Sequence, residues 1–156
     1  MSYHMNADPW WAALTVWGIV NSVNVLQGLG FLSRIRTGGM AVNQQLGYVM
    51  IGLAVPSAVA LAAFLRTGAG WLQWAGPALY IVFIGFMVAV DYIHPLEFRS
   101  PVRGEILIPF LVLFFGSILL MGLPMYRLDR NLWVITVATT VFLLVSMIAA
   151  MRKGVA

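Results

Sequence analysis

The chain has 156 residues, of which 62% are hydrophobic and only 9% are charged, and its formal net charge is +4. A soluble domain has about 25% charged residues, so this composition excludes an ordinary water-soluble fold. The absence of cysteine excludes disulfides, thiolate catalysis and cysteine-ligated metal centres. The basic residues lie at the ends of apolar runs, so their expected partners are membrane lipids with anionic headgroups, and no nucleic acid partner is expected.

Five apolar runs, separated by short polar gaps, occupy nearly the whole chain. A helix needs about 20 apolar residues to cross the roughly 30 Å hydrocarbon core of a bilayer, and each run is about that long. The sequence therefore predicts an all-α integral membrane protein, a five-transmembrane-helix bundle that forms a single membrane domain over residues 1–156. In chain order, the predicted spans are 9–33, 44–65, 71–93, 106–125 and 132–151.

The positions of the basic residues predict the orientation, because cytoplasmic loops carry an excess of lysine and arginine. With the N-terminus outside, the inner face receives six basic residues: Arg34, Arg36, Arg99, Arg103, Arg152 and Lys153. The outer face receives three: Arg66, Arg127 and Arg130. Tryptophans at the starts of odd-numbered spans form an outer interfacial belt in the same arrangement: Trp10, Trp11, Trp71, Trp74 and Trp133. The sequence therefore predicts an outside N-terminus and an inside C-terminus.

A stripe of amides marks the first span. Asn21, Asn24 and Gln27 recur every three residues, which places them within about 120° on one helix face. A buried amide without partners costs about 1–3 kcal/mol, so the stripe is expected to face the bundle interior. Two interpretations remain open. The amides either make hydrogen bonds that hold neighbouring helices together, or they line a polar pocket with Trp17 as an aromatic wall.

A second polar cluster is predicted on the inner face, after the third span. Its members are Asp91, His94, Glu97, Arg99 and Arg103. Asp, His and Glu side chains are able to act as acids and bases or to bind a metal. Pro95, however, biases the preceding residue away from the helix and breaks the regular spacing. The favoured interpretation is an interfacial loop with balanced charges, and no catalytic residue, metal or cofactor is predicted.

Three functions are compatible with these features. The favoured hypothesis is the binding or transport of a small molecule through Asn21, Asn24, Gln27 and Trp17. The first alternative is an accessory or scaffold subunit, or a homo-oligomer, that packs through small residues four apart on the second span: Ala54, Ala58 and Ala62. The second alternative is an enzyme that acts on lipid headgroups at the inner face. The short loops and the lack of a positively charged signal-peptide start favour a prokaryotic inner (plasma) membrane.

Overall fold

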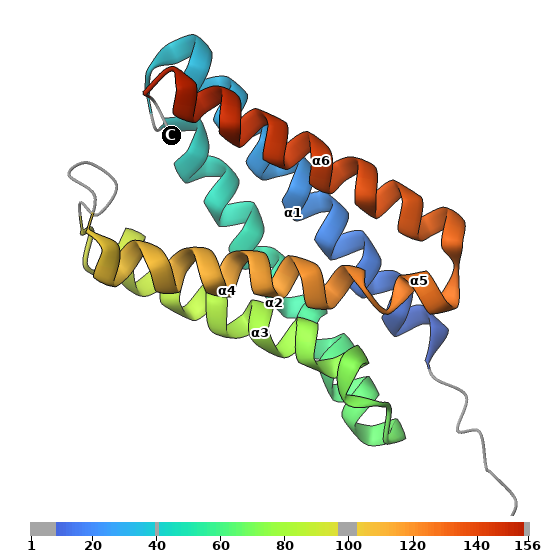
Figure 1. Ribbon diagram of the computed structural model, residues 1–156. Helices are drawn as coiled ribbons and strands as arrows, with labels where there is room; N and C mark the ends of the chain where they lie inside the picture. Colours follow the sequence, from blue (N-terminus) through green and yellow to red (C-terminus); the bar gives the residue numbers. More distant parts are fainter. Residues whose placement is uncertain (1–8, 40, 97–102, 155–156) are drawn as a thin grey trace, which may run out of the picture.

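The computed structural model describes residues 9–39, 41–96 and 103–154, and every regular element in these ranges is a helix (Figure 1). The elements are α1 (Trp10–Thr37), α2 (Ala41–Thr67), α3 (Trp71–Met87), the π-helix η1 (Val88–Ile93), α4 (Gly104–Gly122), the short α5 (Met125–Leu128) and α6 (Arg130–Arg152). Five segments are long and apolar enough to cross a membrane: α1, α2, α3 with η1, α4 with α5, and α6. The prediction of an all-helical chain with five helices long and apolar enough to span a membrane is therefore confirmed for the described residues.

Most helix ends lie a few residues beyond the predicted ones, and a capping residue explains two of these extensions. Helix α1 continues past Ser33 to Thr37, and Gly38 then adopts a left-handed φ of 66° and donates its N–H to the carbonyl of Arg34 at 2.8 Å. Glycine favours this cap because it has no Cβ to clash. Helix α6 begins at Arg130, because the carboxylate of Asp129 accepts hydrogen bonds from the first free backbone N–H groups of the helix.

The helices pack as two pairs that are joined by α2. Helix α1 packs along α6, α3 packs along α4, and α2 contacts both α1 and α3. In Figure 1, α4 and α6 approach each other near α5 and diverge toward the N-terminal end of α4 and the C-terminal end of α6. The two pairs therefore separate at the end of the bundle where α1 ends and α2 begins.

Close backbone contact holds the pair α3 and α4 together. A Cβ atom added at Gly76 would lie 2.6 Å from the backbone nitrogen of Met121, so only glycine allows the two backbones to approach this closely. The core between the helices is mainly apolar, and its largest fully buried side chain is Tyr80. The Tyr80 hydroxyl donates to the carbonyl of Met50 at 2.8 Å, which satisfies a polar group that burial would otherwise penalise.

Candidate ligand-binding pocket

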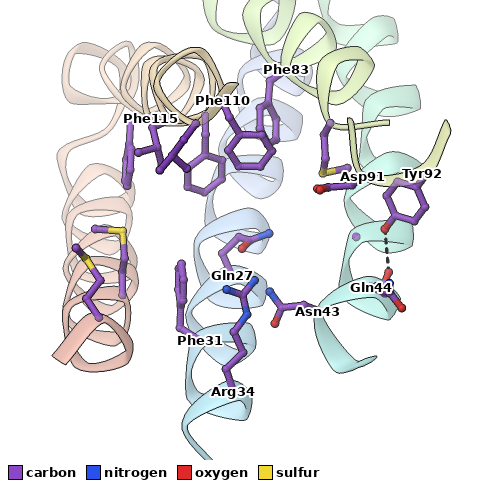
Figure 2. A pocket seen from close by; sticks show the side chains of 17 residues that line it. Gln27, Phe31, Arg34, Asn43, Gln44, Phe83, Asp91, Tyr92, Phe110 and Phe115 are labelled. Atoms are coloured by element: carbon purple, nitrogen blue, oxygen red, sulfur yellow. Dashed lines mark hydrogen bonds between the residues drawn. The ribbon is translucent and has the colours of Figure 1, made fainter. Parts of the chain in front are cut away.

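A pocket of about 350 Å³ lies where the two helix pairs separate, and all five spans contribute to its wall (Figure 2). This volume falls within the range of about 300–1,000 Å³ that is typical of small-molecule sites. The lining residues are Gln27, Phe31, Arg34, Asn43, Gln44, Gly47, Phe83, Met87, Asp91, Tyr92, Leu107, Phe110, Leu111, Phe114, Phe115, Met147 and Met151. They include five phenylalanines and three methionines, whereas the polar members lie mainly toward the C-terminal end of α1, at the N-terminal end of α2 and in η1.

The apolar wall is built from aromatic rings on α3 and α4 that pack against one another. The ring of Phe83 lies 5.3 Å from the ring of Phe110 and 5.3 Å from that of Phe114, measured between centroids. Figure 2 shows Phe83, Phe110 and Phe115 along one side of the pocket. Because contacts between the rings hold them in place, this wall is formed before any ligand arrives.

The polar wall centres on Arg34, a residue that is only 6% exposed. The Asn43 amide is oriented so that its oxygen and its nitrogen both have hydrogen-bond partners. Its oxygen accepts from Nη2 and Nε of Arg34 at 2.5 and 3.1 Å, and its nitrogen donates to the carbonyl of Gly30 at 3.0 Å. The guanidinium also lies over the ring of Phe31, 5.3 Å from its centroid. These contacts fix the charged group at the pocket wall, where burial without hydrogen bonds would be costly.

The π-helix η1 supplies the remaining polar wall. Its wider turn ends with the N–H of His94 donating to the carbonyl of Ala89 at 2.9 Å, immediately before Pro95. The adjacent residues Asp91 and Tyr92 both line the pocket, and the Tyr92 hydroxyl donates to the carbonyl of Gln44 at 3.0 Å. Short π-helical turns are rare and occur frequently at functional sites, which agrees with its position here.

The amide stripe predicted on α1 divides between two environments. Asn21 donates to the Thr136 hydroxyl at 3.2 Å and accepts from the Thr139 hydroxyl at 2.7 Å. Asn24 is fully buried and donates to the hydroxyls of Thr139 and Thr140 at 3.1 and 3.0 Å. Both amides therefore lie in the interface between α1 and α6, as the interpretation of helix-holding hydrogen bonds expects.

The other two members of the predicted ligand site are separated from each other. Trp17 donates its indole N–H to the carbonyl of Leu132 at 2.9 Å, so it also belongs to the interface between α1 and α6. Gln27, in contrast, lines the pocket, and its amide nitrogen contacts the sulfur of Met50. The role of these four residues in ligand binding stays a prediction, but Gln27 is the member of the set that reaches the pocket.

The predicted inner-face cluster is also divided. Asp91 lines the pocket, whereas His94 and Arg103 are exposed, and Glu97 and Arg99 lie outside the described residues. Within the described ranges, no three His, Asp or Glu side chains come close enough together to hold a metal ion. A catalytic role for this cluster therefore gains no geometric support from its described members.

Sequence reasoning missed most of the pocket. It used Arg34 only as one of the basic residues that predict the orientation, and it assigned no role to Asn43, Gln44 or the phenylalanines. A usable signal was present, because an antiparallel bundle brings the C-terminal ends of odd-numbered spans beside the N-terminal ends of even-numbered ones.

Comparison with protein-family models, with curated proteins and with solved structures finds no match for this chain.

Proposed function

We propose that this membrane protein binds a small amphipathic molecule in the pocket between its two helix pairs. The observation that carries the proposal is the division of the wall into an apolar side of aromatic and methionine side chains and a polar side around Arg34 and Asn43. The apolar side suits a hydrocarbon or ring, and the polar groups suit a headgroup that makes hydrogen bonds. The function proposed from the sequence, small-molecule binding, is thereby moved from the middle of α1 to its C-terminal end.

Position within the bilayer supports a ligand that arrives from the lipid. From Phe83 to Asp91 the pocket follows eight residues of α3 and η1, which is about 12 Å at the α-helical rise and so a substantial part of the roughly 30 Å hydrocarbon core. Two lining residues on the diverging helices, Leu111 and Met151, are exposed, so the pocket is open beside them. An amphipathic molecule is able to move sideways from the bilayer into such an opening.

The proposal includes an orientation, with the N-terminus outside and the pocket mouth on the inner face of a prokaryotic inner membrane. It rests on the six-to-three distribution of basic residues and on the short connections between helices. Because the chain has no cysteine, single-cysteine variants report accessibility cleanly. In intact cells, a membrane-impermeant maleimide should label Asn131→Cys and spare Thr37→Cys, and the reverse pattern would refute the orientation.

A photolabelling experiment tests the binding proposal. The protein is placed in lipid nanodiscs with a 12-carbon alcohol that carries a diazirine in its chain, and the labelled residues are mapped by mass spectrometry. Excess dodecanol should suppress labelling of the lining segments of α4 and α6. Leu111→Trp should abolish this suppressible labelling, because the larger side chain occupies the pocket.

Val112→Trp is the matched control. Val112 is the next residue on α4, it is 63% exposed compared with 36% for Leu111, and it does not line the pocket. This variant should label as the unmodified protein does. Labelling that dodecanol never suppresses, or equal suppression in both tryptophan variants, would show that the probe reports only general contact with lipid.

A subunit role remains the second candidate, favoured by one observation on α2. Ala58 and Ala62 of the predicted small-residue seam are exposed, and Ala54 is half-buried, so the chain's own helices leave much of this seam uncovered. A neighbouring membrane helix is able to pack closely there. Oxidative cross-linking of Ala58→Cys in native membranes would support a homo-oligomer if it gives a dimer at a yield above that of the lipid-facing control Val141→Cys.

A further inference from the structure

The charge at the polar wall indicates the kind of headgroup that the pocket accepts. Arg34 carries a guanidinium, and the planar arrangement of its N–H donors matches the oxygens of carboxylates and phosphates. The described residues at this end of the bundle carry further exposed basic groups: Arg36, Arg103, Arg152 and Lys153. The acidic residues described there are Asp91 and Glu105, so the surroundings of the pocket mouth are net positive.

We infer that the ligand is a single-chain amphiphile with an anionic head, a carboxylate or a phosphate, and that Arg34 binds this head. The inference rests on the proposed function of the pocket and deepens it. Arg34 lines the pocket beside the Asn43 amide, and its planar group of N–H donors is suited to an anionic head. The chain of the ligand would then extend toward the rings of Phe110 and Phe115 (Figure 2).

Two features of the wall make an anionic head better suited than a cationic or neutral one. Arg34 is buried, and a buried hydrogen bond to a charged group is stronger than one that is exposed to water. The carboxylate of Asp91 also lines the pocket, but Figure 2 shows it beside Tyr92 on η1, across the pocket from Arg34. An anion beside Arg34 is therefore kept apart from this carboxylate.

Competition for the diazirine alcohol tests the inference in nanodiscs of neutral lipid at pH 8. The three competitors share one chain and differ in the head: dodecanol, dodecanoate and dodecyl phosphate. At least one anion should compete about tenfold better than dodecanol, and the stronger anion identifies whether a carboxylate or a phosphate is preferred. Arg34→Gln should remove this preference, so that the three heads compete to a similar extent, and dodecanol should still suppress labelling in this variant, which shows that the protein is folded with its pocket formed.

Arg36→Gln is the matched control, because Arg36 lies two residues away on α1 and is exposed outside the pocket. It should keep the full preference for anions. Asp91→Asn should keep or enlarge the preference, since it removes a negative charge from the opposite wall. Equal competition by all three heads, preservation of the preference in Arg34→Gln, or its loss in Asp91→Asn would overturn the inference. Failure of the proposed function itself has a different signature, because dodecanol would then suppress no labelling at all.

Discussion

Replacement of Asn21 by alanine measures how strongly the polar interface holds α1 to α6. The side chain makes two interhelical hydrogen bonds, to Thr136 at 3.2 Å and to Thr139 at 2.7 Å. Hydrogen bonds between membrane helices contribute about 0.6 kcal/mol each on average, so their loss costs about 1.2 kcal/mol. Asn21 is half-buried, which limits the cavity that alanine leaves, and the total destabilisation should be about 1–2 kcal/mol.

Equilibrium unfolding in mixed micelles of dodecyl sulfate and a mild detergent measures this loss. A double-mutant cycle with Thr139→Val isolates the single bond between the two side chains, and its coupling energy should be about 0.6 kcal/mol. Ser22→Ala is the control, since Ser22 is the next residue on α1 and is exposed. It should change the free energy of unfolding by less than about 0.5 kcal/mol.

The same variant separates a structural role of Asn21 from a role in ligand binding. Asn21 does not line the pocket, so suppressible photolabelling should persist in Asn21→Ala while stability falls. The opposite result, unchanged stability with loss of suppressible labelling, would refute the assignment of this amide to the helix interface. It would restore the interpretation of the amide stripe as the ligand site.

Two further predictions concern backbone contact and helix capping, and the same unfolding measurement tests both. Gly76→Ala should lower the free energy of unfolding by about 1–3 kcal/mol, because the added Cβ would lie 2.6 Å from the backbone nitrogen of Met121. Gly85→Ala is the control and should be nearly neutral, since no atom lies within 4 Å of its added Cβ. Equal effects of the two substitutions would contradict the close-contact argument. Asp129→Ala should lower the free energy of unfolding by about 1 kcal/mol, because α6 loses its N-terminal cap. Asp129→Asn should keep most of that stability, since asparagine also caps helices. An equal loss in both variants would show that Asp129 does not stabilise the protein as a helix cap.

The helical architecture was predictable because it depends on local properties of the chain. Five runs of sufficient length and apolarity predict five spans wherever the helices lie relative to one another. The extended ends were also encoded locally, since Gly38 and Asp129 are recognisable capping residues. Their influence was underestimated because hydropathy falls at Arg34 and Arg36 before α1 ends. A basic residue does not mark the end of a helix when neighbouring helices bury it, as they bury Arg34.

The inward direction of the amides was predictable, but their partners were not. The burial cost of an amide requires Asn24 to avoid lipid, and it is fully buried. Its partner Thr140 stands 116 residues later in the sequence, and nothing within α1 indicates that α6 is the neighbouring helix. The threonine hydroxyls also donate to their own helix, as Thr140 does to the carbonyl of Thr136 at 2.8 Å, and they still accept from the amides. A hydroxyl that serves both roles is indistinguishable in sequence from one that serves only the first.

The pocket lay beyond sequence reasoning because it follows from how whole helices diverge. A specific contact holds each pair of helices together. Hydrogen bonds between amides and threonines join α1 to α6, and the close backbone approach at Gly76 joins α3 to α4. The space between the pairs therefore depends on their relative angle, which neither contact determines. Gln27 illustrates the consequence, because it continues the stripe of Asn21 and Asn24 but lies where the pairs have begun to separate. One regular stripe on α1 thus contributes to the helix interface at one end and to the pocket wall at the other.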